Sequence, residues 1–258
     1  MKYGVCIGTD AEKIKVLKDT GFDYVETNLT DIATISDEDF EAFLLALKTN
    51  NIPCEASNCF IPGEYKLVGK DVDYEKISAY VSKALARASR AGIKSTVFGS
   101  GAARRIPDGT SREDAHKQLT HFLKEIVSPE AGKYGIRIAI EPLNKKECNC
   151  LNSVLEGVAI ARATDRDNIK TLADLYHVFL EDDQMDDIAA LKGEIIHAHI
   201  ANPIGRCYPA PGDGFDYAPF INALKAAGCE RCSVEAGTKD FENEVPKALA
   251  VLRAINNY

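Results

Sequence analysis

Four side chains of metal-binding type lie at the ends of successive predicted strands in the second half of the chain. They are Glu141, Asp174, His199 and Glu235. Three carboxylates and one imidazole form a hard, mostly oxygen ligand set, which suits Mn²⁺ or Mg²⁺ and is also compatible with Co²⁺ or Zn²⁺. Three converging carboxylates would repel one another, and a divalent cation would compensate their charge. Taken singly, each acid has the alternative of capping a helix or pairing with a cation.

Other polar residues lie close to these ligands in the sequence. Glu147 follows the first ligand by six residues. His177 follows the second by three, in D-L-Y-H, and can face the same cavity to bind a hydroxyl. Arg206, in N-P-I-G-R, can contact a polyol or carbonyl oxygen, or form a salt bridge in solvent. His197 lies two residues before His199 and is expected to be a buried histidine that supports the site or the fold.

Two further motifs are too incomplete to predict a site. The small residues at 99–101, followed by Arg104 and Arg105, are able to hold an anion but lack most of a phosphate loop. Cys229 and Cys232 have C-x-x-C spacing, but no second pair accompanies them at zinc-ribbon distance. The eight cysteines are scattered and are expected to be reduced thiols.

The elements that must position these residues alternate between short apolar runs and longer stretches of helical periodicity. Strands are expected at 3–7, 23–26, 53–58, 95–98, 136–141, 169–174, 195–200 and 231–235. Helices are expected at 11–20, 37–50, 74–91, 111–131, 153–163, a short stretch ending near 193, 216–227 and 243–255. Eight such pairs without a linker predict an α/β fold with one (β/α)₈ TIM barrel as a single domain over residues 1–258.

The barrel explains why four distant residues should meet. Active sites of such barrels lie at the carboxyl ends of the strands. Because side chains alternate along a strand, each ligand shares its face with the residue two positions earlier. These pairs are Ala139 and Glu141, Leu172 and Asp174, His197 and His199, and Ser233 and Glu235. If this face points inward, the four ligands converge at the mouth of the barrel.

The composition limits which binding partners and which cellular compartment are expected. The formal net charge of −8 argues against a surface built for nucleic-acid phosphates or anionic lipid. The chain begins directly with a strand-like run, and no stretch approaches the ~20 apolar residues of a membrane span. We therefore expect a cytoplasmic protein whose partner is a small molecule, with neither nucleic acid nor membrane.

The second half of the chain resembles the ketose 3-epimerases, the D-tagatose and D-psicose 3-epimerase group of the xylose-isomerase-like TIM barrel superfamily. The matching motifs are I-E-P-L-N-K-K-E-C-N-C-L-N, D-L-Y-H, H-A-H-I followed by G-R and P-A-P-G-D-G, and S-V-E-A-G. The resemblance implies that Glu141, Asp174, His199 and Glu235 bind one divalent metal, usually manganese. It also implies that Glu147, His177 and Arg206 bind the sugar, and that a homo-oligomer is possible.

The resemblance further implies an isomerase mechanism. The metal holds O2 and O3 of the ketose and acidifies the hydrogen on C3. One of the two catalytic glutamates, Glu141 or Glu235, removes that proton, and the other returns one on the opposite face through an enediolate. Two features depart from the group: the chain has no Trp, and the segment from His199 to Arg206 is one residue longer than usual. The metal site is therefore better supported than the identity of the sugar.

Other activities known for this barrel stay open. They are a hydroxypyruvate-type isomerase, an inosose dehydratase, and an isomerase of a phosphorylated sugar, for which Arg104 and Arg105 would supply positive charge. An endonuclease-IV-like DNA repair enzyme is disfavoured by the acidic charge and by the lack of extra histidines for a metal cluster. A non-catalytic sugar-binding relative is disfavoured by the complete set of acids.

Overall fold

Eight parallel strands form a closed barrel, as predicted. The computed structural model describes residues 1–256. Each strand pairs with the next in the sequence, and the last pairs with the first. The strands are β1 (Lys2–Cys6), β2 (Tyr24–Asn28), β3 (Cys54–Asn58), β4 (Ser95–Phe98), β5 (Arg137–Ile140), β6 (Ile169–Asp174), β7 (Ile195–Ile200) and β8 (Arg231–Val234).

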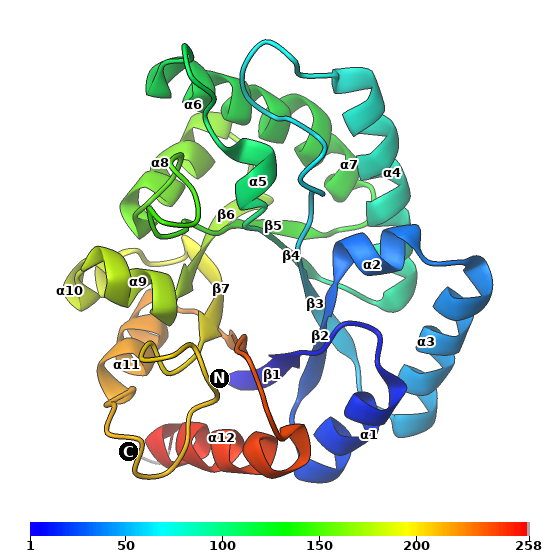
Figure 1. Cartoon of the computed structure of the whole chain (residues 1–258), viewed down its shortest axis with the longest axis vertical. Helices are drawn as coiled ribbons and strands as arrows, with labels where there is room; N and C mark the ends of the chain where they lie inside the picture. The colour runs from blue at the N-terminus through cyan, green and yellow to red at the C-terminus, as the bar shows by residue number, and fades with distance from the viewer. Residues whose placement is uncertain (257–258) are drawn as a thin grey trace.

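Helices surround the barrel and cover its outer face (Figure 1). They are α1 (Ala11–Thr20), α2 (Leu29–Thr34), α3 (Asp37–Asn50), α4 (Tyr74–Ala91), α5 (Gly101–Arg104), α6 (Arg112–His121), the π-helical η1 (Phe122–Val127), α7 (Ser128–Gly132), α8 (Val154–Thr164), α9 (Leu175–Glu181), α10 (Met185–Ala190), α11 (Ala218–Ala227) and α12 (Phe241–Asn256). Within residues 1–256, no helix is long and apolar enough to cross a membrane.

Helix α4 illustrates why these segments fold as they do. The Asp73 side chain accepts a hydrogen bond from the backbone N–H of Lys76 at its start. Gly92 ends it in the left-handed conformation, with φ of 88°. Between these caps, Ile77, Val81 and other apolar side chains at helical spacing are buried. Burial of a large aliphatic side chain contributes roughly 1.5–3 kcal/mol, so this stripe holds the helix against the barrel.

Four segments differ from the prediction. The single short helix expected to end near residue 193 is two helices, α9 and α10. The short helices α2 and α5 form where only loops were expected, and Asn28 caps the first of them by accepting from the Asp31 N–H. The helix expected at 111–131 is divided by the π-helical turn η1. Pro129 has no N–H to donate to the carbonyl four residues earlier, which explains why the regular hydrogen-bond pattern is interrupted there.

The barrel interior contains polar side chains that bond to one another across the strands. The Tyr24 hydroxyl lies 2.8 Å from Ser233 Oγ, although β1 separates their strands. Gly4 on β1 makes room for this crossing, because a Cβ there would lie 2.3 Å from the Tyr24 ring. Glu26 and His197 form a second buried pair, with Oε2 and Nε2 2.7 Å apart. Polar groups are therefore present well below the mouth of the barrel.

Candidate metal centre

The four predicted metal ligands meet at the carboxyl ends of β5 to β8. One ligand atom from each of Glu141, Asp174, His199 and Glu235 lies within 4.8 Å of the others. Asp174 is the last residue of β6, and His199 is the last but one of β7. Both glutamates follow their strands by one residue, where the prediction made them the last strand residue. Their N–H groups still bond to the neighbouring strands, to Phe98 O and Ile200 O, at 3.1 Å.

His199 lies between two of the acids. Its Nδ1 atom is 3.3 Å from Glu141 Oε1 and 3.5 Å from Glu235 Oε2. Its imidazole is fully buried. Burial opposes the charged imidazolium, but the carboxylates of Glu235 and Glu26 outweigh burial and raise the pKa of His199 well above its usual value. The imidazole is therefore surrounded by negative charge.

The acids of this group respond differently to their surroundings. Burial, together with the charges of Glu141 and Glu235, raises the pKa of Asp174 to about 8. Burial, followed by the charge of Glu235, raises the pKa of Glu141. Burial opposes ionisation of Glu235 too, but His199 and Arg206 outweigh it and lower that pKa to about 2. The cluster thus holds more carboxyl groups than its own cations can neutralise.

A divalent cation fits this group of side chains. Asp174 Oδ2 is buried without a hydrogen-bond partner, and the side chains of His177 and Arg206 come no closer than 3.7 Å (Nε2) and 3.8 Å (Nη2). A buried carboxylate oxygen without a partner is costly. Three carboxylates and one imidazole also match the preference of hard cations for oxygen. The donor set and the unsatisfied oxygen both favour a metal here.

His177 presents a neutral N–H to the same space. The Asn144 N–H donates to its Nδ1 at 3.2 Å, so the proton of the neutral ring is on Nε2. Nε2 is buried without a hydrogen-bond partner and lies 4.0 Å from Glu147 Oε2. Burial, then the charge of Arg206, lowers the pKa of His177 to about 3. His177 is thus a neutral donor available to a hydroxyl.

Arg206 contacts the site, although its side chain remains 32% exposed to solvent. Its guanidinium donates to Glu147 Oε1 at 3.2 Å and to Glu235 Oε2 at 3.0 Å. It also stacks over the Tyr176 ring at 4.6 Å from the centroid. Arg206 itself is in the left-handed region, with φ of 47°. The structure therefore brings Glu147, His177 and Arg206 to the rim of the four-residue cluster.

Comparison with known proteins now identifies the family. The sequence model of the xylose isomerase-like TIM barrel family matches residues 14–255. The chain belongs to this family.

Within the xylose isomerase-like barrels, the chain is similar to two curated ketose epimerases. It is 33% identical over 85 residues to a D-psicose 3-epimerase of Agrobacterium fabrum, covering 33% of this chain and 28% of the relative. It is 30% identical over 122 residues to an L-ribulose 3-epimerase of Methylomonas sp., covering 47% and 41%. The matches thus span less than half of these relatives. A D-psicose 3-epimerase from Clostridium cellulolyticum superposes with a TM-score of 0.86 at 19% identity, covering 99% of both chains.

Two residues that the sequence analysis missed form hydrogen bonds with the predicted ligands in this xylose isomerase-like barrel. Asn58, at the end of β3, donates to Glu235 Oε1 at 2.8 Å. Glu26, on β2, accepts from His199 Nε2 at 2.9 Å. Both residues end predicted strands, so the rule that active sites lie at the carboxyl ends of barrel strands points to them as well. The sequence analysis considered only the last four strands. His197 also contacts Glu26, which agrees with its expected supporting role.

Residues that follow β4 contact Glu141 in the candidate metal centre. Arg104 is completely buried and donates to the carbonyl oxygens of Phe98 and Glu141. It is therefore unavailable to a phosphate, which corrects the expectation that both arginines could serve one. A Cβ at Gly99 would lie 2.2 Å from Glu141 Oε2. Only glycine leaves space for the glutamate at this position.

Proposed function

We propose that this chain is a metal-dependent ketose 3-epimerase. The observation that carries the proposal is the presence of two glutamates, Glu141 and Glu235, in one group with Asp174 and His199. Inversion at a carbon needs a proton-transferring group on each face. The glutamates come from the ends of β5 and β8, with β6 and β7 between them, so a substrate is able to lie between their carboxyl groups. The names of both curated relatives agree with this reaction.

Glu141, Asp174, His199 and Glu235 would hold one divalent cation. Mn²⁺ is the first candidate, and Mg²⁺, Co²⁺ and Zn²⁺ are alternatives compatible with the same ligands. When bound, the cation would polarise the sugar oxygens next to C3 and so make the C3 hydrogen more acidic.

Each side chain of the site has a separate role in the proposed reaction. Glu235, kept ionised by His199 and Arg206, accepts the C3 proton. Glu141, on the other side of the substrate, returns a proton on the opposite face of the enediolate. The two glutamates exchange roles in the reverse direction. His177 donates its Nε2–H to a sugar hydroxyl, while Arg206 and Glu147 bind oxygens further along the chain of the sugar.

The assay for this activity compares metal-free and metal-loaded protein. Protein stripped with EDTA is incubated with D-fructose, D-psicose, D-tagatose or L-ribulose, with and without Mn²⁺, and products are separated by chromatography. We expect the 3-epimer of at least one ketose to form, and only with the cation. Formation of no 3-epimer from any of the four, or formation unaffected by EDTA, would contradict the proposal. Conversion of ketose phosphates alone would favour a sugar-phosphate enzyme.

A further inference from the structure

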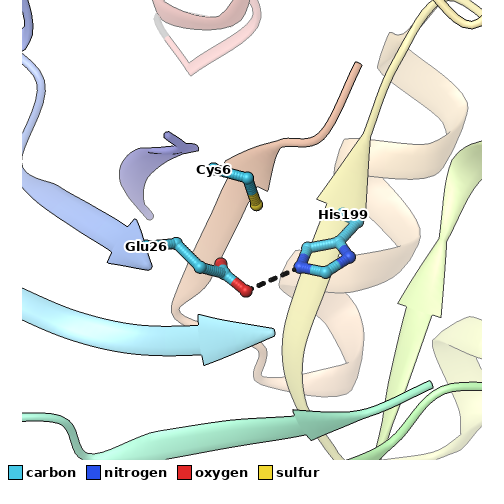
Figure 2. A group of neighbouring side chains, drawn as sticks. All are labelled: Cys6, Glu26 and His199. Atoms are coloured by element: carbon cyan, nitrogen blue, oxygen red, sulfur yellow. Dashed lines mark hydrogen bonds and ion pairs between the residues drawn. The ribbon is translucent and has the colours of Figure 1, made fainter. Parts of the chain in front are cut away.

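Glu26 places a carboxylate in the interior of the barrel, beneath the metal centre. Figure 2 shows its side chain pointing from β2 toward His199 on β7, with Cys6 beside it. The Glu26 side chain is fully buried. Its Oε1 lies 2.9 Å from His199 Nε2, and its Oε2 lies 2.7 Å from His197 Nε2. Strands β1 and β8 separate β2 from β7, so this contact crosses the barrel.

The two imidazoles are the partners of the Glu26 carboxylate. Among the described residues, its ion pairs are with these histidines, and none is with Lys or Arg. An ionised carboxylate only accepts hydrogen bonds, so each short contact requires a proton on Nε2 of the histidine. Both histidines therefore donate Nε2–H to Glu26.

This proton on Nε2 decides what the opposite nitrogen of His199 can do. A metal binds the neutral imidazole, which carries one N–H, so in that form a proton on Nε2 leaves the lone pair of Nδ1 for the cation. Nδ1 is the atom that faces Glu141 and Glu235 at 3.3 and 3.5 Å. The proton on one side of the ring thus makes the other side a metal ligand.

We propose that Glu26 is a positioning residue, which holds His199 as the Nε2–H tautomer and directs the Nδ1 lone pair into the metal centre. The inference rests on the proposed metal-dependent function. His197 supports it by occupying the second oxygen of Glu26, which fixes the orientation of the carboxylate. The alternative, a second metal held by Cys6, Glu26 and His199, is disfavoured because both oxygens of Glu26 already accept from imidazoles.

Metal affinity of Glu26→Gln tests this role. A carboxamide offers one acceptor and one donor group, so it cannot accept from both imidazoles as the carboxylate does. We expect the Kd for Mn²⁺, measured by calorimetry on metal-stripped protein, to rise about 10–100-fold. The matched control is Glu55→Gln on β3, because Glu55 also loses two hydrogen bonds, from Lys2 and Arg231, outside the metal centre. Its Kd should remain that of the wild type.

A second measurement needs no variant of Glu26. Long-range ¹⁵N–¹H spectra of the wild-type protein saturated with Mg²⁺ report the tautomer of each histidine, and His199 is assigned by the signal missing in His199→Gln. We expect Nε2–H for His199. An Nδ1–H tautomer, or a Glu26→Gln Kd within twofold of wild type, would overturn the inference. Failure of the wild type to bind any divalent cation would instead overturn the proposed function.

Discussion

At the scale of single residues, Glu235 is the most constrained acid of the site. Asn58 donates to one of its oxygens, at 2.8 Å, and Arg206 to the other, at 3.0 Å. His199 lies 3.5 Å from that second oxygen. Three neighbours thus fix both the orientation and the charge of the carboxylate. A group held in this way is suited to accept a proton from a bound substrate.

Replacing Glu235 by glutamine should abolish exchange of the C3 hydrogen, because an amide cannot accept the proton. We expect kcat to fall about 10²–10⁴-fold, the usual contribution of a general base. Steady-state kinetics and hydrogen exchange measure the loss. The control Glu230→Gln changes an exposed acid beside β8 and should leave kcat unaltered. Retained C3 exchange in Glu235→Gln would refute its role.

His177→Asn should weaken substrate binding more than it slows chemistry. His177 is proposed to donate one hydrogen bond to a sugar hydroxyl, and a neutral hydrogen bond contributes about 1 kcal/mol. We therefore expect kcat/KM to fall about fivefold, mostly through KM. The exposed His121 on α6 supplies the control substitution His121→Asn. An unchanged KM in His177→Asn would contradict a role in binding.

At the scale of secondary structure, the sequence predicted all eight strands and most of the long helices, because most strands are short apolar runs and long helices such as α4 carry apolar residues at helical spacing. It also predicted that the four ligands would converge, since strand ends meet at one edge of the barrel. The helices α2 and α5 were not predictable from periodicity, because they are only six and four residues long. The role of Arg104 depends on tertiary contacts with β4 and β5, which the sequence pattern does not encode.

A substitution at Gly99, in the loop after β4, tests whether this loop positions Glu141. Gly99 does not have a positive φ, so alanine would be limited only by space. Its Cβ would lie 2.2 Å from Glu141 Oε2 and displace the carboxylate. We expect kcat/KM of Gly99→Ala to fall about 10–100-fold, as small misplacements of catalytic groups do. The control Gly132→Ala, whose Cβ would meet only Asn168 at 3.9 Å, should retain activity. If kcat/KM of Gly99→Ala equals that of the wild type, Gly99 is not needed to position Glu141.

At the scale of the whole molecule, the candidate metal centre is part of the barrel itself. Its four side chains lie at the ends of four adjacent strands, and Glu26 joins β2 to β7 across the interior. Below them, Tyr24 and Ser233 connect β2 and β8. Because the ligand groups are positioned only in the folded barrel, a cation that binds them should stabilise the folded state over the unfolded chain.

Metal binding should therefore raise the melting temperature. At a free Mn²⁺ concentration of about 100 times Kd, the free energy of unfolding should rise by about 2.7 kcal/mol. For a domain of this size, that corresponds to a shift in Tm of roughly 5–10 °C. Thermal unfolding with EDTA and with Mn²⁺ measures it, and His199→Gln should show a much smaller shift. Equal Tm values for the wild type under both conditions would exclude binding at that concentration.

The position of hydrogen exchange tests the proposed reaction most directly. The Mn²⁺-loaded protein is incubated in D₂O with each ketose, and NMR follows deuterium at C1 and C3. We predict deuterium at C3 of the substrate and of its 3-epimer, with none at C1. Deuterium at C1 without C3 would contradict the account and would indicate aldose–ketose isomerisation.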